Sequence, residues 1–110
     1  MRPLALGFIC TTALLLCGCD REIPPERMKS GEDLYGYYCK ECHTKHGPGA
    51  YMEKFAGKEP MEAYKIILMI KYGYNKEKHS MPVFDQLSEK QADAVAQYVV
   101  KLQHSHMTAK

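Results

Sequence analysis

The chain lacks any block of basic residues and has no strong excess of charge of either sign. It contains 15 lysine and arginine residues against 13 aspartate and glutamate residues, for a formal net charge of +2 over 110 residues. Acidic residues alternate with lysines along the chain. Because proteins that bind nucleic acid need clustered basic residues to neutralise phosphates, the sequence predicts no nucleic-acid partner.

The chain also lacks an apolar run that could span a bilayer as a helix, which takes about 20 residues. Its longest leucine-rich run, residues 4–16, is uncharged over thirteen residues and follows a single positive charge, Arg2. This pattern is typical of a secretory signal. The run ends in Leu16-Cys17-Gly18-Cys19, which resembles a bacterial lipobox. We therefore expect a lipoprotein signal peptide over residues 1–18 and lipid attachment at Cys19.

An ordinary signal peptide, or an uncleaved anchor that happens to contain cysteines, is the alternative for this terminus. If Cys19 is processed, Cys10 and Cys17 are removed with the signal. No cysteine then remains for a disulfide, because Cys39 and Cys42 form a separate motif. A domain this small usually needs a metal or a cofactor to complete its core.

That separate motif is Cys39-Lys40-Glu41-Cys42-His43. Two cysteines three positions apart, followed at once by histidine, form the C-x-x-C-H pattern of covalent haem attachment. On a helix the two cysteines share a face, so both thiols can add to the vinyl groups of one porphyrin. The motif thus predicts one covalently bound haem c, with Cys39 and Cys42 as its attachment residues and His43 as an axial ligand of the iron.

Two rival interpretations of the motif lack the residues that they need. A thioredoxin-like dithiol expects a strand before the motif and βαβ units around it, and the chain offers neither. A structural zinc site needs a second ligand pair at similar spacing. The remaining histidines supply no such pair; they are His46, His79, His104 and His106.

Three segments with helical signals surround the motif. Ser30 is the expected N-cap of a helix from about Gly31 through Cys42. Residues 61–72 are apolar on nearly every side, which predicts a helix buried on several faces and ended by Gly73. A capping box at Ser88 and Gln91 begins the last helix, after which residues 103–110 are expected to fray. Before the first helix, residues 19–30 contain Pro24-Pro25 and predict an extended tether.

The order of these features resembles the class I cytochromes c over about residues 30–103. That order is a glycine, an aromatic residue, C-x-x-C-H, a middle helix, Met-Pro and a C-terminal amphipathic helix. The resemblance implies an all-α fold for residues 31–110. Its N- and C-terminal helices would cross, with Gly31 and Tyr35 against Tyr98. The haem pocket would be closed by the middle helix and a methionine-bearing loop.

Met81 precedes Pro82 in the place where this family carries its distal ligand, so the resemblance assigns Met81 to the iron. A thioether is a soft ligand that suits haem iron, and His/Met ligation raises the reduction potential. Pro82 biases Met81 toward an extended backbone, which helps to present its side chain. The alternative is a methionine that packs on the porphyrin beside an open iron position.

The resemblance implies a one-electron carrier rather than an enzyme, because His43 and Met81 would fill both axial positions. The expected partners are redox proteins of a bacterial membrane respiratory chain, met by a monomer that is lipid-anchored on the periplasmic side. Asp20 after the lipidated cysteine resembles an inner-membrane retention signal. Two alternatives stay open: a haem-based ligand binder or sensor with a displaceable Met81, and a thiol or metal-delivery factor that uses free Cys39 and Cys42.

Overall fold

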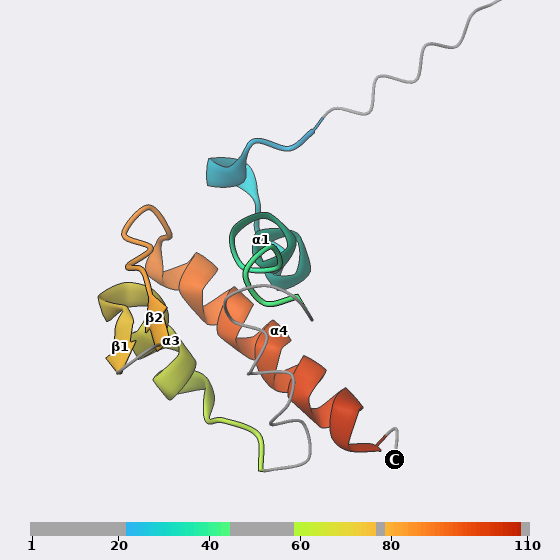
Figure 1. Cartoon of the computed structure of the whole chain (residues 1–110). Coiled ribbons are helices and arrows are strands. Elements are labelled where there is room, and N and C mark those ends of the chain that lie inside the picture. The colour runs from blue at the N-terminus through green and yellow to red at the C-terminus, as the bar shows by residue number, and fades with distance from the viewer. Residues whose placement is uncertain (1–21, 45–58, 77–78, 109–110) are drawn as a thin grey trace, which may run out of the picture.

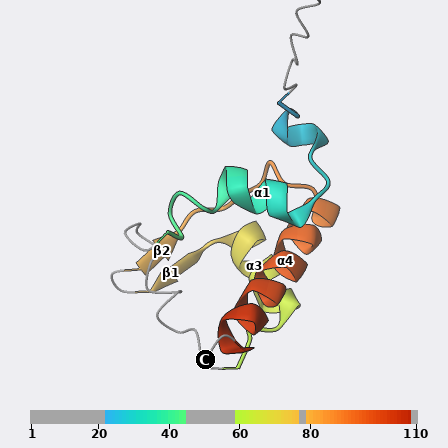
Figure 2. The same ribbon diagram turned by 90° about the vertical axis from the view of Figure 1, so that its right-hand side faces the viewer.

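The computed structural model of the chain describes residues 22–44, 59–76 and 79–108. In chain order these form a 3-10 turn η1 (Pro25–Arg27), helices α1 (Gly31–Tyr38) and α3 (Ala63–Tyr72), strands β1 (Tyr74–Lys76) and β2 (His79–Met81), and helix α4 (Glu89–Thr108). Helix α4 is the long central element, and both α1 and α3 pack against it (Figure 1). The strands follow α3 directly and extend from its end, as a second view shows (Figure 2).

Helix α1 crosses α4 at a point where the two backbones nearly touch. A Cβ placed on Gly31 would meet the carbonyl group of Ala94 and would lie 2.9 Å from the Cβ of Tyr98. One turn further along α1, the rings of Tyr35 and Tyr98 have centroids 5.4 Å apart. These are the contacts that the resemblance to the class I cytochromes c implies for Gly31, Tyr35 and Tyr98. Only glycine permits this crossing, because any side chain would occupy the space of the α4 backbone.

The buried core of the described residues is small and draws on all three α-helices. Leu34 of α1, Ile70 of α3 and Val95 of α4 are each at most 1% exposed. The other buried hydrophobic residues are Cys39, Ile66, Leu87, Ala92 and Ala96. The buried side chains of the described residues give limited hydrophobic stabilisation, which a bound apolar group would increase.

The start of α4 is the predicted capping box. The backbone N–H of Gln91 donates to Ser88 Oγ at 3.3 Å, and the N–H of Ser88 donates to Gln91 Oε1 at 3.0 Å. The helix then continues to Thr108, so the expectation that it frays from residue 103 is wrong. A tertiary bond explains part of the difference, because Gln103 Oε1 accepts a hydrogen bond from the N–H of Met61 at 2.8 Å.

Gln91 also binds the segment that precedes α1. Its Nε2 donates to the carbonyl oxygens of Pro25 and Met28, at 3.2 and 3.0 Å. The expected extended segment therefore contains the 3-10 turn η1, and the chain from Pro25 onward is attached to the N-terminal end of α4. Cys19 and the predicted signal peptide lie outside the described residues.

We expect the substitution Gln91→Glu to release the segment before α1 and to preserve the capping box at the start of α4. Glutamate retains an oxygen for the Ser88 N–H but has no donor for the carbonyls of Pro25 and Met28. The loss of two hydrogen bonds should lower the free energy of unfolding by about 1–2 kcal/mol. Trypsin should also cleave faster after Arg27 in native protein.

Gln86→Glu is the matched control for this prediction, because it makes the same charge change at an exposed position. Its trypsin cleavage rate at Arg27 should equal that of the wild type. Equal rates in all three proteins would contradict the attachment of the segment through Gln91.

Among the residues that the structure describes, helix α3 is buried on one face. Ile66 and Ile70 are buried, whereas Tyr64, Leu68 and Tyr72 are 56%, 49% and 77% exposed. The prediction of burial on several faces is therefore wrong. The sequence shows that the segment is apolar, but it does not show that α4 packs along one side of the helix. The helix also begins at Ala63 rather than at residue 61, since Glu62 has an extended backbone and forms the N-cap. Its end at Gly73, with φ 75°, is as predicted.

The strands β1 and β2 correct the expectation of an all-α fold. They form a two-stranded antiparallel sheet in which Tyr74 pairs with Met81 and Lys76 pairs with His79. Met81 therefore ends a strand rather than lying in an open loop. The intervening sequence has none of the Asn-Gly or Asp-Gly signals that identify a tight hairpin, so the local sequence did not predict this sheet.

Candidate haem site

The C-x-x-C-H motif follows α1 as a series of turns. The N–H groups of Cys39 and Lys40 both donate to the carbonyl oxygen of Tyr35, each at 2.9 Å, and α1 ends at Tyr38. The N–H of His43 then donates to the carbonyl oxygen of Cys39 at 3.0 Å. A helix through Cys42 was expected and is wrong, because the shared acceptor at Tyr35 breaks the regular ladder. The hydrogen bond from His43 to Cys39 still closes a turn over the five residues of the motif.

The two cysteines lie in different environments. Cys39 is 7% exposed and belongs to the buried core, whereas Cys42 is exposed, and the two are not joined by a disulfide. Burial, and to a lesser degree the neighbouring Cys42, raises the pKa of the Cys39 thiol to about 11. Reactive dithiols need the opposite, a thiol pKa below its ordinary value. The environment of Cys39 therefore argues against thiol–disulfide chemistry.

His43 lies beside the crossing of α1 and α4. It is half-buried, and its ring centroid is 6.4 Å from that of Tyr35, which itself contacts Tyr98. Thr44 Oγ1 donates to the carbonyl oxygen of Glu41 at 3.3 Å and closes the turn around the motif. The position of His43 thus follows from the helix crossing.

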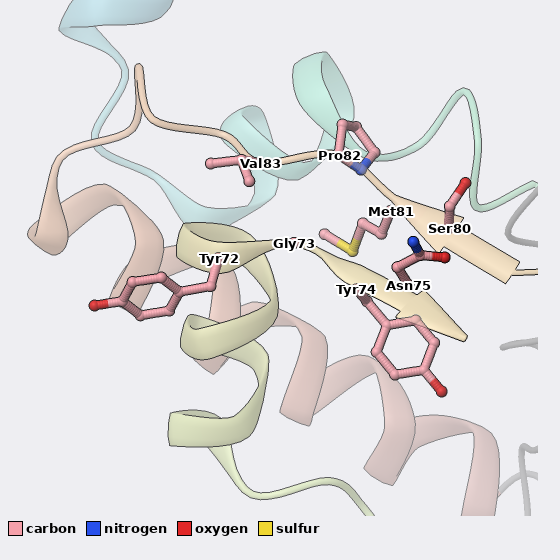
Figure 3. Close-up of a pocket in the computed structure, with 8 residues that line it drawn as sticks. All are labelled: Tyr72, Gly73, Tyr74, Asn75, Ser80, Met81, Pro82 and Val83. Atoms are coloured by element: carbon pink, nitrogen blue, oxygen red, sulfur yellow. The ribbon is translucent and has the colours of Figure 1, made fainter. Parts of the chain in front are cut away.

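Met81 is half-buried at the end of β2 and packs against the core. Its side chain extends over β1, beside Gly73 (Figure 3). Phe84, three residues further on, makes an edge-on contact with Tyr38 at 6.2 Å between ring centroids. Because Tyr38 directly precedes Cys39, this contact connects the methionine segment to the attachment motif.

A surface depression of about 380 Å³ lies around Met81. Its other lining residues are Tyr72, Gly73, Tyr74, Asn75, Ser80, Pro82 and Val83 (Figure 3). Its size falls within the range of small-molecule sites. Cys39, Cys42 and His43 do not line it, so this depression does not bring the four predicted haem residues together.

The residues present fit a covalent haem by their chemistry. They offer two thiols at attachment spacing, an imidazole and a thioether, which are the groups that hold haem c and its iron. Large apolar side chains remain only partly buried against the small core, including Tyr38, Met61, Ile67 and Phe84, and an apolar macrocycle would cover such side chains. Among residues 22–44, 59–76 and 79–108, no three histidine, cysteine or acidic side chains form a cluster that could hold a bare metal ion.

Comparison with known families decides the classification. The family model for cytochrome C oxidase, cbb3-type, subunit III matches residues 26–99, a range that includes the attachment motif and Met81. The chain belongs to this family. Membership in the cbb3-type subunit III family implies a c-type haem and haem-based electron transfer. Comparisons with curated proteins and with solved structures give no match.

Membership in the cbb3-type subunit III family also favours a periplasmic or membrane-associated location. In the part of the chain that the structure describes, none of the helices has the length and apolar character needed to cross a bilayer.

The sequence gives no local signal for the residues that hold the Met81 segment in place. Lys71 Nζ donates to the carbonyl oxygen of Leu87 at 2.8 Å, and the N–H of Phe84 donates to the carbonyl oxygen of Ile70 at 2.9 Å. Each bond joins residues at least fourteen positions apart. Gly73 was predicted only as a helix end, although it also touches the methionine segment.

Proposed function

We propose that this chain is a one-electron carrier that holds one haem c through Cys39 and Cys42, with His43 and Met81 as the two iron ligands. The observation that carries the proposal is the family match over residues 26–99, which contains both the attachment motif and Met81-Pro82. When bound, the haem supplies a reversible one-electron change at its iron. The chain's own residues bind and orient the group, choose its ligands and exclude water.

The proposal assigns a role in haem binding to several side chains. Cys39, in the core, and Cys42, at the surface, would fix one edge of the haem. Met81 would hold the second axial position with a soft sulfur, which raises the reduction potential. Tyr38 and Phe84 would exclude water from the side that they cover. With both axial positions filled, the iron offers no open position to a substrate, so we propose a carrier and not an enzyme.

The partners in this proposal are redox proteins of a bacterial membrane respiratory chain. Lipid on Cys19 would hold the monomer on the periplasmic side, and Asp20 favours the inner membrane. The exposed Lys40 and Lys76 would steer an acidic partner surface. Each of the two alternative functions makes a different demand on one residue. A ligand binder requires Met81 to leave the iron readily. A thiol factor requires a reactive Cys39, which the burial of this residue opposes.

The test is to express the full chain with a cytochrome c maturation system and to record oxidised and reduced absorption spectra together with the intact mass. We expect one covalently attached c-type haem per chain and no titratable thiol at Cys39 or Cys42. The oxidised protein should show the weak far-red band of sulfur bound to ferric iron.

The control is the double variant Cys39→Ser/Cys42→Ser, which should carry no covalent haem. A mature wild-type protein without haem and with both thiols titratable would contradict the proposal and return these cysteines to thiol chemistry.

A further inference from the structure

The end of α3 and the segment that carries Met81 meet at several consecutive residues. Tyr74 pairs with Met81 across the two strands. Beyond Pro82, the N–H of Phe84 donates to the carbonyl oxygen of Ile70 at 2.9 Å. Further on, Lys71 Nζ donates to the carbonyl oxygen of Leu87 at 2.8 Å. Residues 70–74 of α3 and β1 thus hold the segment at Met81 and again beyond Pro82.

Gly73 lies at the closest of these approaches. Its backbone has φ 75° and ψ −179°, a region that is essentially restricted to glycine. A Cβ at this position would lie 2.9 Å from the carbonyl oxygen of Met81 and 3.2 Å from Val83 Cγ2. Any side chain at residue 73 would therefore push the backbone of Met81 away from α3 and strain the turn into β1.

We propose that residues 70–74 form a clamp that positions Met81 on the iron, and that Gly73 is the positioning residue of this clamp. The proposal rests on the proposed function, because it takes Met81 as the distal ligand. By holding the backbone at Met81 and again beyond Pro82, the clamp would keep the sulfur on the iron and would exclude external ligands. The clamp therefore makes the protein an electron carrier rather than a ligand binder.

The hydrogen bonds of the clamp differ from those that place the attachment motif. Cys39, Cys42 and His43 are placed by the turns after α1 and by the crossing of α1 with α4. Residues 70–74 make their bonds to the segment 81–87 instead. A change at Gly73 is thus expected to alter the ligand on one side of the haem while covalent attachment and His43 remain.

The experiment compares Gly73→Ala with the wild type, both as haem-loaded full chains. We expect Gly73→Ala to weaken the far-red sulfur band, to lower the reduction potential and to increase the rate of CO binding to the reduced protein roughly tenfold. Gly36→Ala is the matched control, because a Cβ there meets nothing within 4 Å. It should leave the band, the potential and the CO rate unchanged.

Lys71→Met provides a second test if Gly73→Ala yields no folded protein, because it removes only the donor to Leu87 and keeps an unbranched apolar stem. It should also speed CO binding, by a smaller factor than Gly73→Ala. Wild-type CO rates and an undiminished sulfur band in the folded variants would overturn the clamp alone. Absence of the sulfur band from the wild type itself would overturn the assignment of Met81, and the clamp proposal with it.

Discussion

Replacing Met81 by leucine should lower the reduction potential of the haem-loaded protein and open its iron to CO. Leucine is close to methionine in volume, so the substitution removes the sulfur with little change in packing. Because axial ligand identity spans about 0.8 V across haem proteins, we expect a fall on the order of 0.1 V or more. Potentiometric titration and CO binding to the reduced protein would measure both effects.

Met69→Leu is the matched control, since Met69 is a half-buried methionine of α3. This variant makes the same methionine-to-leucine change at a different position. Its reduction potential and its CO binding should match those of the wild type. If Met81→Leu also behaved as wild type, Met81 would not be an iron ligand. If Met69→Leu alone changed the potential, the ligand would have to be sought on α3.

Replacing Gly31 by alanine should strongly destabilise the domain. The added Cβ would meet the Ala94 carbonyl and lie 2.9 Å from the Cβ of Tyr98, so α1 would have to move away from α4. Overpacking of this kind typically costs about 1–3 kcal/mol, and contact with a backbone that cannot give way places the cost at the upper end. That is a large share of the roughly 5–15 kcal/mol that stabilises an ordinary domain.

Thermal unfolding of the haem-loaded protein would measure this effect. Gly36→Ala, in the same helix but in open space, is the control. It should raise the free energy of unfolding by about 0.5–1 kcal/mol, because alanine favours a helix more than glycine does. Equal stability of Gly31→Ala and Gly36→Ala would show that α1 does not cross α4 as the structure has it.

These two predictions probe different parts of the fold. Gly31 lies in the α1–α4 crossing, which positions the turns of the attachment motif and His43. Met81 lies on β2, which pairs with the strand that follows α3. We therefore expect Gly31→Ala to act mainly on the free energy of unfolding and Met81→Leu to act mainly on the reduction potential. The contact of Tyr38 with Phe84 connects the two parts.

The sequence alone determined the features that depend on near neighbours or on a simple period. The spacing of Cys39, Cys42 and His43 is local, as is the capping box that begins α4, where Ser88 and Gln91 bond to each other. Gly73 ends α3 because its positive φ suits glycine. The contact of Gly31 and Tyr35 with α4 came from the resemblance to a known order of elements.

Only the tertiary structure decided the features whose partners lie far apart in the chain. The pairing of Met81 with Tyr74 made a strand from an expected loop. The bonds from Gln91 to Pro25 and Met28 attached an expected tether. The packing of α4 along one side left the other face of α3 exposed. None of these contacts has a signature in a short stretch of sequence, because each depends on which segments the folded chain brings together.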